Sequence, residues 1–414
     1  MQSNNIKILK PRNLLLIFDI LAIGMLIFYD KTEINKNIAI MTSALIILLY
    51  LSNILLEKVT SGDHYIFLIV SMLLSIGVII NFSIDQYFGF KHILWSLLGI
   101  VAFYGTYFIL KISRKWYKLM NFYIALSLLL FILTLAIGKE FHGSKNWIII
   151  GDVISFQPSE FIKILLIFII GSYYTNIQKY KDQKNAPYIL MAIVYIFIGF
   201  LFVQRDMGSA VLFLAIYTGL QFIFEEKRSL IWINVFLVLA GVFAGYLIFP
   251  HVRVRFNIWL DPWVPAAGQI LESLIAMASG GFFGSGIGLG YPKFIPVVNS
   301  DFIFAAICEE MGMFVGIGVI MLFMLLVYRG LKIALVQRNT FYRIIAIGVS
   351  ISFGVQIILA LGGVTKFIPM TGITLPFVSY GGSSMIASFI SLAILQAASE
   401  EFEQRIRLED GEYE

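Results

Sequence analysis

The chain has 414 residues, of which 59% are apolar and 13% are charged, and its net charge is +5. This composition excludes an ordinary soluble globular protein, whose helices would show amphipathic stripes instead of continuous apolar runs. The single cysteine, Cys308, lies in an apolar run, which excludes both an intrachain disulfide and a cysteine metal site.

Apolar runs of about 20 residues follow one another along the chain, and this pattern is typical of membrane-spanning helices. They predict an all-α polytopic membrane protein with about twelve transmembrane helices. The first run begins after MQSNNIKILKPRN and no small-residue cleavage site follows it, so we expect no cleavable signal peptide. The expected spans are residues 13–29, 38–56, 64–82, 92–110, 119–138, 159–175, 187–203, 210–224, 230–249, 302–328, 341–363 and 375–398.

Basic residues recur in alternate connections, and with twelve spans they all fall on one side of the membrane. By the positive-inside rule that side is the cytoplasm, so both termini and the charged tail 401–414 are expected there. The residues concerned are Lys7, Lys10 and Arg12, then Lys111, Arg114, Lys115 and Lys118, then Lys179, Lys181 and Lys184, then Lys227 and Arg228, and finally Arg329, Lys332 and Arg338.

Four connections on the opposite side hold the tryptophans, prolines, glycines and isolated charges that simple hairpins do not need. They are residues 139–158, 204–208, 365–372 and the large extracytoplasmic loop 250–301. Loops on a rigid scaffold are where function concentrates. The chain has no phosphate-binding Gly-Lys-Ser/Thr loop and no HExxH motif, so neither an ATP-driven mechanism nor a nucleic-acid partner is expected.

Glu160 and Lys163 are three residues apart where the sixth span begins, so they share one helix face. They form either a self-neutralising pair that snorkels to the interface or a charged site that lines a cavity. Arg205 and Asp206 are adjacent and point in different directions, either as an interfacial cap of the eighth span or as part of the same cavity.

The 250–301 loop carries Arg253 and Arg255, then the stretch WLDPWVPAAGQ with the lone acid Asp261. The apolar run 270–278 predicts a short interfacial helix, and glycines follow it. Asp301 lies at the mouth of the tenth span. Glu309 and Glu310 lie about two turns deeper, where a buried acid is costly unless it is paired or protonated. Helix packing is the alternative for these two acids, and also for the small polar segment around Ser379.

At these residues the chain resembles the SEDS family (shape, elongation, division and sporulation proteins), which includes RodA, FtsW and SpoVE. The similarity covers roughly residues 119–400. The segments that carry it are KNWIIIGDVISFQPSEFIKI, QRDMGSA, ASGGFFGSGIGLG, IPVVNSDFIFAAICEEMGMFVG and IPMTGITLPFVSYGGSS, in the order of the family.

The resemblance implies a peptidoglycan glycosyltransferase of the bacterial cytoplasmic membrane that polymerises lipid II on the outer face. It implies a class B penicillin-binding protein as partner, and a divalent cation (Mg or Mn) could assist Lys and Arg side chains at the departing pyrophosphate. With Asp261 as the catalytic base, the expected substrate cavity comprises Lys145, Trp147, Gln157, Glu160, Lys163, Arg205, Asp206, Arg253, Arg255, Gln269, Lys293, Asp301, Glu309, Glu310 and Ser379.

The chain departs from the family pattern in two places. Five spans precede the Trp147 segment where the family has three, which predicts a two-span addition at 1–63 before a ten-helix core at 64–400. Val264-Pro265 stands where the family has the Asp-Pro that carries its essential acid, so only Asp261 remains in this stretch. Two alternatives therefore stay open, a SEDS-like scaffold with weak or no polymerase activity and a flippase for lipid-linked precursors.

Overall fold

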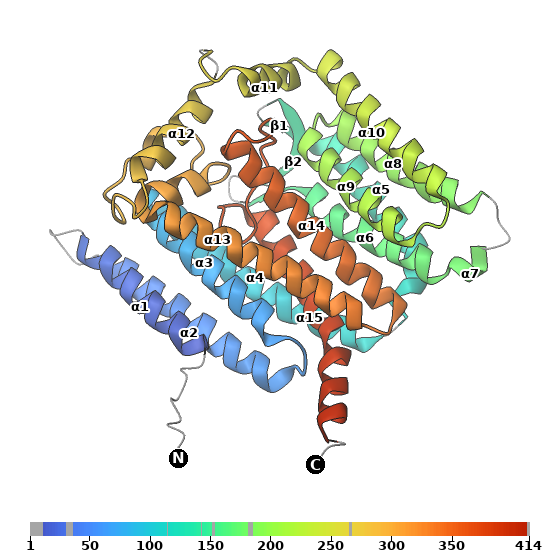
Figure 1. Ribbon diagram of the computed structural model, residues 1–414, viewed down its shortest axis with the longest axis horizontal. Helices are drawn as coiled ribbons and strands as arrows, with labels where there is room; N and C mark the ends of the chain where they lie inside the picture. Colours follow the sequence, from blue (N-terminus) through green and yellow to red (C-terminus); the bar gives the residue numbers. More distant parts are fainter. Residues whose placement is uncertain are drawn as a thin grey trace, which may run out of the picture.

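Long helices run back and forth through the computed structural model, and the chain reverses direction at each end of them (Figure 1). The structure describes residues 11–29, 36–113, 115–141, 143–150, 154–180, 185–264 and 267–411. Lys7, Lys10, Arg114, Lys181, Lys184 and Pro265 of the sequence predictions therefore lie outside the described residues, as do the side chains of the 401–414 tail. The helices are α1 (Pro11–Tyr29), α2 (Lys36–Val59), α3 (His64–Ile84), α4 (Gln86–Ile112), α5 (Met120–Ile137), α6 (Pro158–Thr175), α7 (Ile177–Tyr180), α8 (Ala186–Val203), α9 (Met207–Phe224), α10 (Arg228–Ile248), α11 (Pro250–Leu260), α12 (Gly268–Gly280), α13 (Ile303–Val336), α14 (Thr340–Val364) and α15 (Gly382–Gly411), with 3-10 turns at Trp116–Leu119 and Pro292–Phe294.

Ten helices within the described residues are long and apolar enough to cross a membrane, namely α2, α3, α4, α5, α8, α9, α10, α13, α14 and α15. The molecule is therefore a multi-pass helical membrane protein. The other two expected spans, 13–29 and 159–175, are helices α1 and α6, which are not among the ten. Twelve crossings thus stays a prediction.

Helices α3, α14 and α15 are mostly buried and form the centre of the bundle, where α14 contacts α6, α9, α13 and α15. Small residues let these helices approach closely, as is usual in membrane bundles. A Cβ atom at Gly348 of α14 would lie 2.7 Å from the Ile167 side chain of α6, and one at Gly330 of α13 would lie 2.2 Å from Ser350 Oγ of α14. Larger residues at either position would push the helices apart.

The helical bundle confirms the all-α prediction, and the connection between α5 and α6 adds a small sheet to it. Strands β1 (Lys139–Phe141), β2 (Ser144–Ile150) and β3 (Ile154–Phe156) pair antiparallel in that order, with Ile148 opposite Phe156. A connection that lies against the bundle must satisfy its own backbone N–H and C=O groups. The β-branched run Ile148–Ile150 favours a strand as the way to do so.

Several helices differ in their bounds from the expected spans. Helix α4 begins at Gln86 instead of 92, and helix α13 continues to Val336 instead of ending at 328. Helix α15 begins at Gly382 instead of 375. Pro376 disfavours helical backbone at the residue before it, and Phe377 has a left-handed φ of 65°.

The predicted two-span addition at 1–63 corresponds to helices α1 and α2, which pack against α3 along one side of the bundle (Figure 1). Polar groups face each other across this contact: Asn53 Nδ2 donates to Ser71 Oγ at 3.0 Å. The apolar side chain of Phe18 packs against the buried residues Ala22 of α1 and Ile79 of α3, against which Ile287 and Met311 also pack. The division of the chain into a 1–63 addition and a 64–400 core stays a prediction.

The 250–301 loop contains the helices α11 and α12, and α12 confirms the expected helix at 270–278. The glycine-rich turn after α12 inserts into the hydrogen-bond ladder of α13. Met313 N and Phe314 N donate to Gly281 O and Phe282 O instead of to Glu309 O and Glu310 O. Those two carbonyls accept from Ser285 N and Gly286 N instead. Four bonds replace two, and α13 kinks at Gly312, where φ is +86°.

Replacing Gly312 by alanine should disrupt this insertion. The new Cβ would lie 2.4 Å from Phe282 O and from Phe283 C, both backbone atoms, and φ at this position is +86°. We expect a destabilisation of about 2 kcal/mol or more, measured as a lower Tm of the purified protein in detergent.

The matched control is Gly318→Ala in the same helix, where a Cβ meets nothing within 4 Å. Equal Tm values for the two variants would contradict a structural requirement for glycine at 312.

Candidate functional site

The four loops that the sequence analysis singled out meet at one end of the bundle, here called the loop-rich end. Lys145 N donates to Gln204 O at 2.9 Å, which joins the sheet to the turn before α9. Ser379 Oγ donates to Ser300 O at 2.5 Å, which joins the segment before α15 to the end of the 250–301 loop. The expected convergence of these loops is confirmed.

Asp206 is the hub of this end of the bundle. It caps α9, and its Oδ1 accepts from Ser209 N at 3.0 Å. Its Oδ2 accepts from Asn146 Nδ2 at 2.8 Å, from Ser209 Oγ at 2.9 Å and from Gln157 Nε2 at 3.4 Å. Hydrogen bonds to a carboxylate are stronger than neutral ones. One buried side chain therefore binds β2, α6 and α9 together.

Glu160 and Lys163 form an ion pair one turn further along α6. Lys163 Nζ lies 2.8 Å from Glu160 Oε2, and both side chains are nearly buried. Lys163 Nζ also donates to Gln356 Oε1 at 2.9 Å, and Gln356 Nε2 donates to Thr374 O at 3.2 Å. The pair belongs to a network inside the bundle, so the alternative of a pair that snorkels to the interface is wrong.

Arg255 reaches from α11 to the segment that follows α14, where its Nη1 donates to Thr371 O at 3.1 Å. The hypothetical Cβ of Gly372 would lie 3.5 Å from Asp301 Oδ2 and 3.6 Å from Arg255 Nη2, so these two side chains flank the same glycine. Burial lowers the pKa of the Arg255 guanidinium, and the carboxylates of Asp301 and Asp206 oppose that shift. Arg255 thus connects electrostatically to the Asp206 hub.

The imidazole of His251 lies in the positive potential around Arg255, which affects its pKa. Burial lowers the pKa of its imidazole, and the charges of Arg255 and Arg205 lower it further. The half-buried Arg255 thus carries its positive charge beside a histidine that is less easily protonated than a free one.

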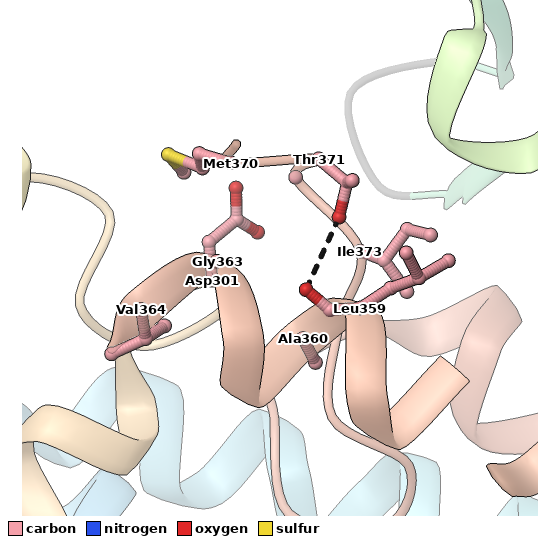
Figure 2. Close-up of a pocket in the computed structure, with 9 residues that line it drawn as sticks. Asp301, Leu359, Ala360, Gly363, Val364, Met370, Thr371 and Ile373 are labelled. Atoms are coloured by element: carbon pink, nitrogen blue, oxygen red, sulfur yellow. Dashed lines mark hydrogen bonds between the residues drawn. The ribbon is translucent and has the colours of Figure 1, made fainter. Parts of the chain in front are cut away.

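A small pocket of about 10 Å³ lies between Asp301 and the stretch from Leu359 to Ile373. Figure 2 shows the Asp301 carboxylate beside the Met370–Thr371 segment and the Thr371 hydroxyl bonded to Leu359 O, at 3.4 Å. This volume is about that of one water molecule. The pocket therefore has room for a single water molecule between Asp301 and the Leu359–Ile373 stretch.

Asp261, the expected catalytic base, lies elsewhere. It ends α11 on the surface, and its Oδ1 accepts from Trp263 N at 3.0 Å. Its described side-chain hydrogen bond is this turn contact, and none joins it to Glu160 or Lys163. The structure therefore gives Asp261 a turn-capping contact, and its catalytic role stays a prediction.

Glu309 and Glu310 hold the glycine-rich turn. Glu309 Oε1 accepts from Tyr291 N at 2.9 Å, and Glu310 Oε2 accepts from Ser83 Oγ at 2.6 Å. Both side chains are buried. These contacts match the packing alternative, and they place the two acids on α13 and not in the network of Lys163.

The other expected site residues are distributed around this end of the bundle. Lys145 Nζ donates to Leu135 O at the end of α5, at 2.6 Å, and Arg205 forms an exposed ion pair with Glu140 at 3.5 Å. Ser379 Oγ accepts from Leu375 N within its own turn. Trp147 and Gln269 are half-buried, whereas Arg253 and Lys293 are exposed.

The sequence analysis missed Asn146, Ser209, Gln356 and Ser383, all of which bond to the predicted residues. Gln356 gave a usable signal, since a polar amide in the middle of an apolar span is rare and usually functional. Ser383 accepts from Gln157 N at 3.0 Å and sits in the SYGGSS segment. Nothing in the sequence of that segment distinguishes Ser383 from serines that serve helix packing.

Among the residues that the structure describes, no group of three or more His, Cys, Asp or Glu side chains could hold a metal ion. A divalent cation therefore stays a prediction from the family resemblance.

Comparison with known proteins identifies the family. The model of the FtsW, RodA and SpoVE cell cycle proteins matches residues 59–404. The chain belongs to this family.

Relatives match over most of their length. The chain is 34% identical to peptidoglycan glycosyltransferase RodA of Mycobacterium tuberculosis (strain H37Rv) over 330 residues, which cover 75% of this chain and 70% of the relative. It is 32% identical to stage V sporulation protein E of Bacillus subtilis over 363 residues, which cover 82% of this chain and 97% of the relative.

Solved structures share the fold. A chain of a peptidoglycan synthase complex gives a TM-score of 0.69 at 24% identity and covers 82% of this chain and 98% of that one. RodA of Thermus thermophilus gives a TM-score of 0.61 at 24% identity, and the match covers 82% of this chain and 97% of that chain.

A double-mutant cycle at Glu160 and Lys163 should reveal their coupling. Lys163→Met leaves a nearly buried carboxylate without its counter-charge, and we expect it to cost about 3 kcal/mol of stability. In Glu160→Gln/Lys163→Met that uncompensated charge is gone. We therefore expect the double variant to unfold at a higher temperature than Lys163→Met alone.

The control pair is Arg205 and Glu140, which is exposed and should contribute little when broken. Additive Tm changes at Glu160 and Lys163 would show that the two side chains act independently.

Proposed function

We propose that this protein polymerises lipid II into glycan strands on the outer face of the bacterial cytoplasmic membrane. The observation that carries the proposal is the loop-rich end of a membrane bundle, where carboxylates accompany two cations: Lys163 pairs with Glu160, and Arg255 lies in the field of Asp301 and Asp206. A lipid-linked substrate keeps its tail in the bilayer, so its sugars and pyrophosphate meet the protein at such an end. Relatives named peptidoglycan glycosyltransferase support the same activity.

The proposed reaction is a single displacement with inversion at the anomeric carbon of the donor sugar. An acceptor hydroxyl forms the new C–O bond while the bond from that carbon to undecaprenyl pyrophosphate breaks, and the pyrophosphate leaves with the electron pair. The hydroxyl proton passes to a carboxylate that acts as general base.

Lys163 and Arg255 are suited to the leaving group. A lysine ammonium has three donors, and the bonds to Glu160 and Gln356 use two of them. Fixed positive groups that face developing negative charge stabilise the transition state without reorganising. A divalent cation at the pyrophosphate stays a prediction from the family resemblance.

Two carboxylates are candidates for the general base. Asp261 is the acid that the sequence offers in the 250–301 loop, but its side chain caps an exposed turn. Asp301 is half-buried, flanks Gly372 together with Arg255 and borders the pocket of Figure 2. The nearby charge of Arg255 favours Asp301, whereas the family resemblance favours an acid in the stretch that holds Asp261.

The surface position of Asp261 also favours a second function, that of a SEDS-like membrane scaffold with weak or no polymerase activity. In either case we propose a class B penicillin-binding protein as partner, which agrees with the structural relative that comes from a peptidoglycan synthase complex. We further propose that both termini lie in the cytoplasm, since the basic connections fall at the end of the bundle opposite the sheet.

Purified protein, reconstituted with lipid II and its class B partner, should produce glycan strands that are resolved by gel electrophoresis. Replacing the base should lower the rate at least about 100-fold. Asp261→Asn and Asp301→Asn test the two candidates, because asparagine keeps the hydrogen-bonding shape and removes the basic carboxylate.

Glu226→Gln is the control, since Glu226 is also an exposed carboxylate and lies in the connection between α9 and α10, away from the loop-rich end. Absence of polymer from the folded wild-type complex would select the scaffold function. Unchanged rates in both Asp261→Asn and Asp301→Asn would remove both from the chemistry.

A further inference from the structure

Three aromatic rings and a lysine lie together where the start of α4 meets the segment before α15. The ring centroids of Tyr87 and Phe88 are 5.5 Å apart, and those of Phe88 and Tyr380 are 5.3 Å apart. Lys91 Nζ lies 4.2 Å from the Tyr87 ring centroid and within electrostatic reach of the Tyr380 hydroxyl. We call these four residues the aromatic surface.

The aromatic surface is accessible but held in place. Tyr87 is 56% exposed, and the other three residues are partly exposed. Tyr380 N donates to Asn299 O at 2.8 Å, while Asp85 caps the helix turn that carries Tyr87. A ligand that docks on pre-positioned rings pays little entropy for ordering them.

The aromatic surface is linked to the candidate site through buried contacts. Ser383, three residues after Tyr380, accepts from Gln157 N at 3.0 Å. Gln157 Nε2 in turn reaches the Asp206 hub. Tyr380 and the Asp206 hub therefore lie at the same end of the bundle.

Anchoring of α4 at the membrane interface is the simpler explanation of Tyr87 and Lys91, because tyrosine and lysine are common at that level. It does not account for Tyr380, which belongs to another element and is tied to the 250–301 loop through Asn299. Nor does it account for the ring contact between Phe88 and Tyr380, which joins the two elements into one surface.

We propose that the aromatic surface is a saccharide-binding subsite for an N-acetylated sugar of the peptidoglycan glycan. The C–H face of a sugar ring packs on aromatic rings, and the Lys91 ammonium binds amide oxygens or carboxylates of the attached peptide. The subsite rests on the proposed polymerase function and adds a position at which the glycan is held. The sugar belongs either to the lipid-linked precursor or to the growing strand.

The test uses Tyr380→Leu and Lys91→Gln in the full-length protein reconstituted with its class B partner. If the subsite holds the precursor, the KM for lipid II should rise about fivefold, with kcat within twofold. If it holds the growing strand, KM should stay constant and the mean strand length should fall by at least half. Tyr380→Trp restores a ring and should restore either property.

Tyr65→Leu is the matched control, because Tyr65 is 51% exposed and packs with Arg329 at 4.3 Å at the opposite end of the bundle. The subsite proposal would be overturned if Tyr380→Leu and Lys91→Gln gave the same KM and strand length as Tyr65→Leu. A lower Tm with a lower kcat alone would also overturn it, because a purely structural role predicts that result.

A binding measurement separates the subsite from the polymerase function. The probe is the soluble N-acetylglucosamine–N-acetylmuramic acid disaccharide peptide, titrated into the wild type and Tyr380→Leu in nanodiscs. Weaker binding to Tyr380→Leu supports the subsite even where the wild-type complex makes no polymer. Equal binding, or none to the wild type, contradicts it.

Discussion

The carboxylate of Asp206 is the contact on which the loop-rich end depends. Its two oxygens accept bonds from a backbone amide, a serine and two side-chain amides, which arise from β2, α6 and α9. Each of these elements enters the bundle from a different loop. Without a common acceptor, their polar groups would be buried beside a membrane with nothing to bond to, which is costly.

The same principle explains the charges next to this hub. Lys163 is buried, and an isolated ammonium there would be costly. Glu160 neutralises it and Gln356 Oε1 accepts a hydrogen bond from its ammonium, so the cation persists within an apolar bundle. Asp301, Asp206 and the carbonyl of Thr371 stabilise the half-buried Arg255 in a similar way. Two positive charges are thereby held at this end of the bundle.

Much of this arrangement could be predicted from the sequence, and the limits have physical causes. Apolar runs fixed the long helices, and the three-residue spacing of Glu160 and Lys163 predicted their pairing. Gln356 was missed because its partner comes from a helix far along the chain. The insertion of 281–286 into α13 was missed because backbone groups make it, and these leave no side-chain pattern. Asp261 was singled out by elimination, a method that says nothing of where a side chain points.

The exchange of hydrogen bonds between the glycine-rich turn and α13 has a mechanical consequence. Four backbone bonds join the turn to the helix, and two of them replace bonds that the helix would otherwise make to itself. The turn therefore cannot be lifted while α13 stays intact. Force applied to the 250–301 loop from outside is therefore transmitted to α13, a helix that runs the depth of the bundle. The turn moves together with α13 and does not open independently of it.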